Sequence, residues 1–189
     1  MTRRRRPHIP LRQPIYVGCE GASEAGYAAL LRDMATDAGG HVHLHIDKLG
    51  PGAGDPLARI EMAVHRIERL RRTRAAFVSR FAFLDEDQAE REPARANRAR
   101  SLAEENDITI IWQRSCFEAV LLRHFPERAT HRPPTSQDAL RALMREWPDY
   151  KKPLDRAALA RRIDVNSVLR AAAVELDLAV LLRVLGLLA

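Results

Sequence analysis

Acidic side chains follow two apolar runs of the sequence, and both runs are typical of buried strands. Glu20 comes directly after residues 15–19, and Asp85 and Asp87 come just beyond residues 76–84. Open α/β sheets bind ligands just outside the carboxyl ends of their parallel strands. We therefore expect Glu20, Asp85 and Asp87 to meet at one edge of a sheet. Carboxylates gathered there would hold a hard divalent cation, which points to phosphate-ester chemistry.

The spacing of the acids also fits a metal site. Asp85 and Asp87 are two residues apart, and their side chains converge if the strand breaks into a loop between them. Glu24 lies one helical turn after Glu20 and supplies an additional carboxylate on the same face. Mg²⁺ (or Mn²⁺) held by these four acids would polarise a phosphodiester and position a hydroxide. The simpler alternative is that the acids only decorate loops.

The order of elements predicts an α/β fold. Four strands that alternate with helices imply a parallel, right-handed sheet that helices cover. Apolar runs place strands at residues 15–19, 76–84 and 108–113, and strict alternation of histidine with apolar residues places another at 41–46. Helical periodicity and end signals place helices at 23–38, 57–72, 94–106 and 117–125. The charged segment 86–95, which contains Pro93, is expected to be a loop over the site.

The remainder of the chain is expected to be helical. A linker at 126–136 precedes predicted helices at 137–146, 156–162 and 165–188. The last of these is apolar on most of its circumference, so we expect it to pack on the domain or on a partner. We divide the chain into a basic disordered arm (1–14), a catalytic domain (15–130) and a helical C-terminal extension (131–189).

The composition is that of a basic globular protein. The chain has 189 residues and a formal net charge of +6, and its basic residues are nearly all arginine. A positive surface attracts polyanions, although a GC-rich genome also explains an excess of arginine. The arm with Arg3–Arg6 either contacts nucleic acid or acts as a solubilising tail. Two cysteines without a secretory signal indicate a reducing, cytoplasmic location, and the apolar stretch 176–189 is too short and too charged to span a membrane.

Four short motifs occur in order along most of the chain. They are Cys19-Glu20-Gly21 followed by Glu24 and Tyr27, Leu84-Asp85-Glu86-Asp87, Cys116-Phe117-Glu118 followed by residues 121–125, and Asp149-Tyr150-Lys151-Lys152. Together they resemble the motifs of the RloB family, which comprises small proteins with a Toprim-like fold from restriction-linked and phage-defence loci. The chain departs from the family pattern at Arg114-Ser115, where Asn-Pro is usual, and after about residue 160.

The resemblance implies a function and roles for particular residues. It implies a Toprim-like four-stranded sheet in which Asp85 and Asp87 hold the metal and Glu20 acts as a general base or metal ligand. It adds Glu118 and Lys152 to the candidate catalytic residues. It further implies a nuclease that acts on DNA or RNA as the effector of a bacterial anti-phage system, with an ATPase partner encoded nearby. A homo-oligomer stays an open alternative.

Three of the motif residues also have simpler explanations. Glu118 is either a site residue or a solvated acid in the first turn of a helix, where the helix dipole favours it. His124 is either a proton shuttle or, as we expect of a lone histidine, a hydrogen-bonded structural residue. Lys152 either neutralises charge on the scissile phosphate or forms a surface pair with Lys151 after Pro148.

Two classes of function are compatible with these patterns. The first is metal-dependent hydrolysis of phosphodiesters. The second is a non-catalytic nucleic-acid-binding or adaptor subunit of an ATPase-containing defence complex. The acidic clusters favour the first class, because carboxylates that face a phosphate weaken binding unless a cation lies between them. Strand passage and primer synthesis are disfavoured, since the chain lacks the additional domains that those reactions need.

Overall fold

The computed structural model describes residues 12–50, 55–73 and 76–189. Most of the predicted basic arm therefore lies outside the described residues. The elements occur in the order β1 (Gln13–Cys19), α1 (Ala22–Asp37), β2 (Val42–Lys48), α2 (Pro56–Arg71), β3 (Ser79–Asp85), α3 (Glu86–Arg91), α4 (Pro93–Glu105), β4 (Ile108–Gln113), α5 (Phe117–Leu122), α6 (Ser136–Glu146), α7 (Arg156–Ala160), α8 (Val165–Ala172) and α9 (Leu176–Val184).

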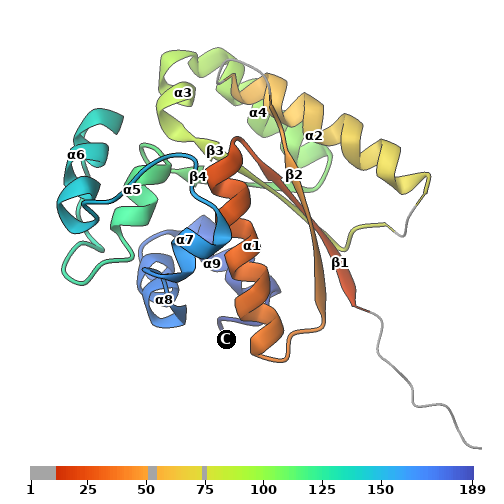
Figure 1. Ribbon diagram of the computed structural model, residues 1–189. Helices are drawn as coiled ribbons and strands as arrows, with labels where there is room; N and C mark the ends of the chain where they lie inside the picture. Colours follow the sequence, from red (N-terminus) through yellow and green to blue (C-terminus); the bar gives the residue numbers. More distant parts are fainter. Residues whose placement is uncertain (1–11, 51–54, 74–75) are drawn as a thin grey trace, which may run out of the picture.

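The four strands form one parallel sheet in the order β2-β1-β3-β4, flanked by helices (Figure 1). This confirms the predicted fold class and is consistent with a Toprim-like fold. The connection from β1 to β2 runs through α1, and the connection from β2 to β3 runs through α2. Strand β2 pairs with one edge of β1 and β3 with the other, so the strand order reverses at β1. Helices α1 and α2 accordingly pack in different hydrophobic clusters. The carboxyl ends of β1 and β3 therefore lie at a topological switch point, where sheets of this kind bind ligands.

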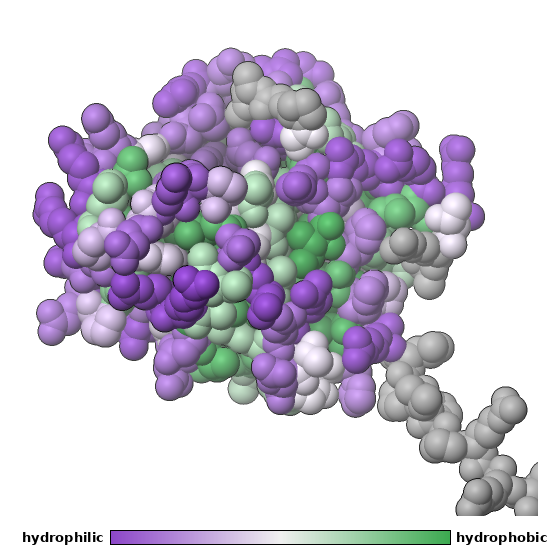
Figure 2. All heavy atoms as spheres, viewed as in Figure 1, coloured by the Kyte–Doolittle hydropathy of each residue, from purple (hydrophilic) through white to green (hydrophobic). Residues whose placement is uncertain are grey.

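Alternating side chains of β1 explain the two layers of core. Ile15 and Val17 belong to the cluster that contains α1, α5 and the C-terminal helices. Tyr16 lies on the opposite face and belongs to the cluster of α2 and α4. Both faces are thus covered, as expected of a parallel sheet. Figure 2 shows hydrophilic atoms over most of the side that carries α1, with hydrophobic atoms visible near its centre.

The C-terminal helices share the core with the sheet. Val168 of α8 and Leu178 of α9 are buried in the same cluster as Ile15 and Val17. The segment predicted as one helix, 165–188, is instead two helices that are separated at residues 173–175. The break places Glu175 at the N-cap of α9, where its side chain is buried. Within the described residues, no helix has both the length and the apolar character needed to cross a membrane.

The segment after β3 also differs from the prediction. We expected residues 86–95 to form a loop, but residues 86–91 form α3 and α4 begins at Pro93. Glu86 and Asp87 occupy the first turn of α3, where the positive end of the helix dipole stabilises acidic side chains. Proline is well tolerated in the first turn of α4, so Pro93 begins the next helix instead of excluding a helix.

Candidate active site

Glu20 and Asp85 lie side by side at the carboxyl edge of the sheet. Strands β1 and β3 are neighbours, and Cys19 pairs with Phe83, so the residues that follow them are adjacent. Glu20 Oε2 accepts a hydrogen bond of 3.2 Å from the backbone N–H of Asp85. Asp85 Oδ1 in turn accepts a hydrogen bond of 2.9 Å from the backbone N–H of Phe117, at the start of α5. Two of the predicted site residues are therefore brought together.

Asp87 lies near this pair but makes its contacts elsewhere. Because the chain continues as a helix and not a loop, the side chain of Asp87 is directed toward α6. Its Oδ2 accepts a hydrogen bond of 2.6 Å from Ser136 Oγ and lies 3.9 Å from Arg91 Nη2. Among the described residues, none is a hydrogen-bond partner for its buried Oδ1. The expected convergence of Asp85 and Asp87 around one point is therefore incomplete.

Glu24 is buried on the first turn of α1, one turn beyond Glu20. Gly21 leaves room for its carboxylate, since a Cβ atom at position 21 would lie 2.9 Å from Glu24 Oε2. Burial raises the pKa of Glu24, and the charges of Glu20 and Glu118 raise it further. Lys152 opposes this effect. Glu24 therefore shares one electrostatic environment with the acids of β1 and α5.

Glu118 and Lys152 form an ion pair beside these acids. Glu118 is only 6% exposed, so it is not a solvated acid of the first turn. Its Oε1 lies 2.5 Å from Lys152 Nζ and accepts a hydrogen bond of 2.9 Å from the Tyr150 hydroxyl. Burial alone would raise the pKa of Glu118, but Lys152, a backbone hydrogen bond and Tyr150 together lower it. Burial likewise would lower the pKa of Lys152, but Glu118, Glu24 and Asp85 together raise it. Lys152 thus stays a cation next to the acidic cluster.

Helix α1 positions the segment that carries Lys152. The backbone N–H of Leu154 donates a hydrogen bond of 3.0 Å to Ser23 Oγ. A Cβ atom built at Gly26 would lie only 2.5 Å from the carbonyl oxygen of Leu154. The missing side chain at position 26 therefore permits the close approach that places Lys152 over Glu118.

Replacing Gly26 with alanine should lower the free energy of unfolding by about 2 kcal/mol, because the crowded backbone at residues 154–155 must move. Helix propensity alone predicts the opposite sign, a gain of about 1 kcal/mol. Urea unfolding monitored by circular dichroism measures the difference. A more stable Gly26→Ala variant would show that this close contact does not exist.

Asp85 experiences the strongest field in the cluster. Burial and the charges of Glu20, Glu24 and Asp87 raise its pKa to about 8, and Lys152 offsets only part of this effect. Four carboxylates that carry more negative charge than nearby cations balance would favour a divalent cation.

The donor chemistry suits Mg²⁺, but the side chains are not arranged as a ligand shell. In the part of the chain that the structure describes, no three His, Cys, Asp or Glu side chains form a group that could hold a metal ion. Several carboxylates already accept from protein donors: Glu20 contacts the Asp85 amide, Asp85 the Phe117 amide, and Glu118 contacts Lys152. A cation that bound here would share these carboxylates with the protein donors or replace some of them.

A comparison with protein families identifies the group to which this chain is related. The model of the RloB-like proteins matches residues 15–177. The chain belongs to the RloB-like family. The match extends beyond Lys152, where the recognisable motifs end, and it includes helix α8 and the start of α9. No curated protein and no solved structure matched the chain.

In this RloB-like chain His124 has a structural position. It is buried, and its Nδ1 lies 2.9 Å from the carbonyl oxygen of Val120, which only accepts hydrogen bonds. Nδ1 therefore carries the proton, and Nε2 accepts from the Tyr27 hydroxyl at 2.9 Å. Burial lowers the pKa of His124 to about 4, so the ring stays neutral. These contacts agree with the structural role and not with a proton shuttle.

Sequence reasoning missed the contribution of Arg59. This arginine is buried on α2, and its Nη2 lies 3.8 Å from Glu20 Oε1. A signal was present, because Arg59 falls next to Ile60 on the inward face of a helix where arginine is rare. The hydroxyl of Ser136 was missed as well, since only the fold brings α6 next to Asp87.

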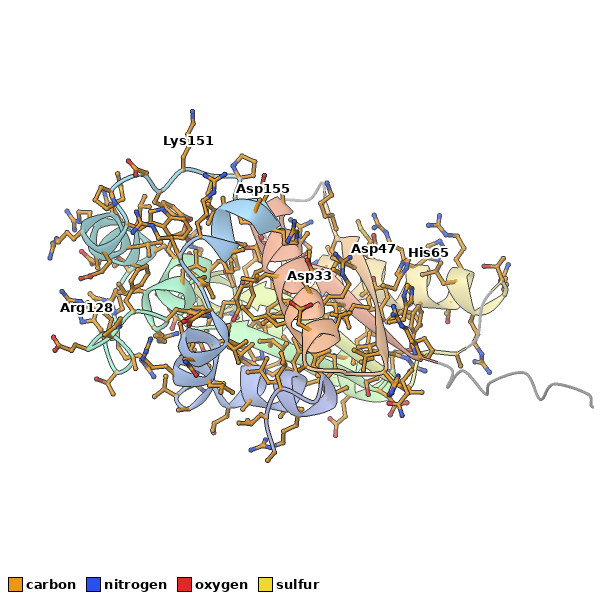
Figure 3. All side chains as sticks on the ribbon, turned by 60° about the horizontal axis from the view of Figure 1, so that its bottom comes forward. Asp33, Asp47, His65, Arg128, Lys151 and Asp155 are labelled. Carbon is orange, nitrogen blue, oxygen red and sulfur yellow. The ribbon has the colours of Figure 1, made fainter. Side chains whose placement is uncertain are left out.

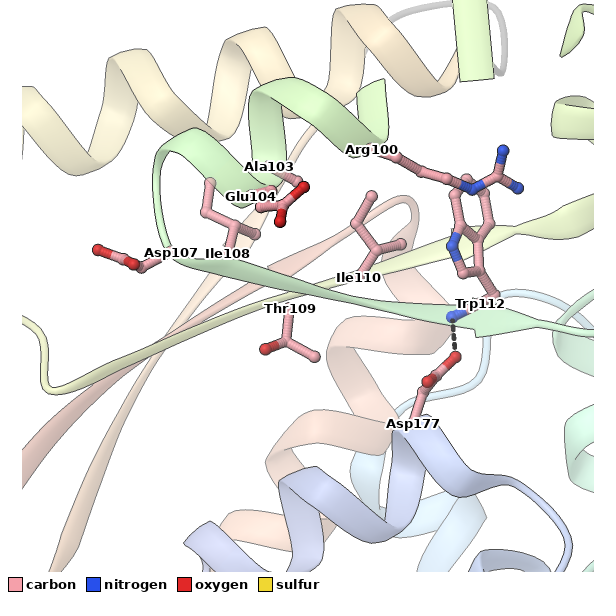
Figure 4. A pocket seen from close by; sticks show the side chains of 9 residues that line it. All are labelled: Arg100, Ala103, Glu104, Asp107, Ile108, Thr109, Ile110, Trp112 and Asp177. Carbon is pink, nitrogen blue, oxygen red and sulfur yellow. Dashed lines mark hydrogen bonds between the residues drawn. The ribbon is translucent and has the colours of Figure 1, made fainter. Parts of the chain in front are cut away.

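Two cavities of similar size differ in their relation to the acids. One, of about 550 Å³, lies along the outer edge of β4 (Figure 4). Its lining includes three acids and one cation, Arg100. One of the acids, Asp177, accepts a hydrogen bond of 3.4 Å from the Trp112 amide. That lining disfavours a polyanion. The other cavity, of about 540 Å³, includes Asp87 and Ser136 and opens beside the candidate site.

Proposed function

We propose that this RloB-like protein is a metal-dependent nuclease that hydrolyses phosphodiester bonds of DNA or RNA. The observation that carries this proposal is the contact between Glu20 and Asp85 at a switch point of the sheet, with Glu24 and the Glu118–Lys152 pair in the same electrostatic environment. An acidic cluster with the cations Lys152 and Arg59 beside it is suited to a substrate whose charge is neutralised on binding.

The side chains can be given distinct roles in this proposal. Asp85, Asp87, Glu24 and Glu20 would hold Mg²⁺ or Mn²⁺, which supplies Lewis-acid polarisation of the phosphodiester and a lowered pKa of bound water. Glu20 also acts as the general base that accepts a proton from the attacking water. Lys152 Nζ neutralises charge on the phosphate, and Glu118 keeps Lys152 protonated and in place.

The biological setting follows from the family resemblance. RloB-family proteins are associated with restriction-linked and phage-defence loci, so we propose that the nuclease is a cytoplasmic defence effector. An ATPase partner would control it, which keeps a nuclease inactive until infection. The engaged carboxylates support such control, because protein donors compete with a cation for the same acids.

The same observation favours one second candidate. Glu20, Asp85 and Glu118 are all held by protein donors, and they form no ready ligand shell with the other described residues. A protein that keeps this arrangement would act as a non-catalytic nucleic-acid-binding or adaptor subunit. The two candidates differ in turnover and not in binding.

Cleavage assays separate the candidates. Labelled single-stranded DNA, duplex DNA and tRNA are incubated with the protein in Mg²⁺, Mn²⁺ or EDTA, with and without the ATPase encoded nearby. We expect cleavage that requires the metal and that falls at least about 100-fold in Glu20→Gln. Glu105→Gln, an exposed acid at the end of α4, is the matched control and should retain full activity. Binding without cleavage in all conditions would support the adaptor instead.

A further inference from the structure

A third cavity lies on the other side of the segment that carries Lys152. It measures about 320 Å³, and the cations Lys151, Arg161 and Arg162 line it together with Trp147, Leu154 and Ala158. We call it the basic pocket. Lys151 extends from the connection between α6 and α7 into solvent, and Asp155 is at the start of α7 (Figure 3). The pocket therefore combines an apolar floor with a cationic rim.

The three cations of the basic pocket are not neutralised by the protein. Lys151, Arg161 and Arg162 are exposed, and none of them makes an ion pair with another residue that the structure describes. Other arginines nearby are paired, as Arg156 is with Asp33 at 3.1 Å. Unpaired cations around a concave surface raise the local concentration of anions and stay available to bind one.

The carboxylates of the pocket only partly oppose this charge. Asp155 is engaged at the N-terminus of α7, where its Oδ1 accepts a hydrogen bond of 2.7 Å from the Ala158 amide. Asp149 is the other acid in the lining, so cations outnumber acids by three to two. A guanidinium group can donate two parallel hydrogen bonds to the oxygens of one phosphate. A surface rich in carboxylates has no such donors.

The basic pocket is continuous in sequence with the candidate site. Lys151 is in the pocket, whereas the next residue, Lys152, contacts Glu118 at 2.5 Å. A strand that enters the acidic site would therefore pass the segment at residues 151–155 and bring a neighbouring backbone phosphate to the pocket. The apolar floor formed by Trp147 and Leu154 is suited to the sugar of the same nucleotide.

We propose that the basic pocket binds a backbone phosphate of the nucleic acid, outside the scissile position, and holds the strand across the acidic site. This inference rests on the proposed function for the identity of its ligand. It assigns Arg161 and Arg162 to substrate binding without base recognition, because contacts to phosphate carry no sequence information.

The test measures binding and not cleavage. The fluorescence anisotropy of a labelled single-stranded DNA of about 20 nucleotides is measured in EDTA as the protein is added. The full wild-type chain is compared with the double variant Arg161→Ala/Arg162→Ala. We expect Kd to rise about tenfold in the double variant. The plot of the logarithm of the association constant against the logarithm of the salt concentration should become less steep, by about 0.7 for each lost phosphate contact. Arg161→Lys/Arg162→Lys should restore most of the affinity.

The control removes the same charge elsewhere. Arg69→Ala/Arg72→Ala deletes two exposed arginines at the end of α2 and should change Kd less than twofold. Equal weakening in both double variants would mean that only net charge matters, and no weakening in either would mean that the pocket is not used. Each result overturns the proposal, as does competition by polyglutamate that equals competition by unlabelled DNA, because the pocket would then bind an acidic peptide.

The outcome is independent of catalysis. If the protein binds DNA through the basic pocket but never cleaves it, the pocket stands and the nuclease proposal fails. If the protein cleaves DNA and the double variant binds normally, only the pocket proposal fails. A wild-type chain that does not bind the 20-mer at low salt also overturns the pocket.

Discussion

Replacing Asp85 with asparagine should abolish cleavage, by a factor of about 10³ or more, and at the same time stabilise the metal-free protein at pH 8. The loss follows from removing a carboxylate that we propose holds the metal, on the residue whose backbone N–H contacts Glu20. The gain follows because partial burial of Asp85 and the charges of Glu20, Glu24 and Asp87 raise its pKa to about 8. Asparagine keeps the oxygen that accepts from the Phe117 amide, so packing should survive.

The pH dependence has a defined sign. In the unfolded chain an aspartate releases its proton near pH 4, whereas in the folded protein Asp85 holds it up to about pH 8. Between these values the folded state binds more protons, so the stability of the wild type falls as the pH rises. Asp85 is partly exposed, which reduces the effect, and we expect a loss of about 3 kcal/mol across this range.

Urea unfolding in EDTA at pH 5, 6.5 and 8 checks this prediction. The wild type should become less stable along the series, while Asp85→Asn should change little, with Glu105→Gln as the charge-matched control. Mg²⁺ at pH 8 should then raise the melting temperature of the wild type and not of Asp85→Asn. Parallel pH profiles for the wild type and Asp85→Asn would show that the acids do not interact as described.

Much of the fold could be predicted because its signals are local. Three strands are short apolar runs and β2 alternates apolar with polar residues, and all four predicted strands form within a few residues of their expected bounds. Helix α3 was missed because charge and Pro93 were taken as loop signals, although acids in a first turn and proline at a helix start are both favourable. The break at residues 173–175 was missed since the apolar pattern continues through it.

The candidate site could be predicted only in part, since its assembly depends on strand order and on distant contacts. Glu20 and Asp85 meet because β1 and β3 are adjacent, which no local pattern reveals. The pairing of Glu118 with Lys152 depends on the docking of residues 150–155 against α1. Asp87 was expected to join Asp85, but the helical path of α3 directs it to Ser136.

The second large effect concerns a buried ion pair between α5 and α9. Arg123, at the end of α5, is 1% exposed, and its Nη1 lies 2.6 Å from Oε1 of Glu175, at the N-cap of α9. Burial lowers the pKa of Arg123 to about 10, although Glu175 counteracts this. Burial raises the pKa of Glu175, and Arg123 counteracts that shift in turn. Arg132 lies 3.7 Å from the same Glu175 oxygen and also lowers the pKa of Glu175, so Glu175 has a second counter-charge, whereas Glu175 is the acid that offsets the burial of Arg123.

Glu175→Leu should lower the free energy of unfolding by about 3–5 kcal/mol, because it leaves the Arg123 guanidinium buried without its counter-charge. Arg123→Met should cost less, because Arg132 remains 3.7 Å from the Glu175 carboxylate. The double variant should recover most of the loss, since apolar side chains of similar volume can replace a buried pair at little cost. Urea unfolding of the four proteins forms a double-mutant cycle, and additive losses would mean that the charges do not interact. Recovery in the double variant would show that the buried pair adds little net stability compared with apolar side chains at the same two positions.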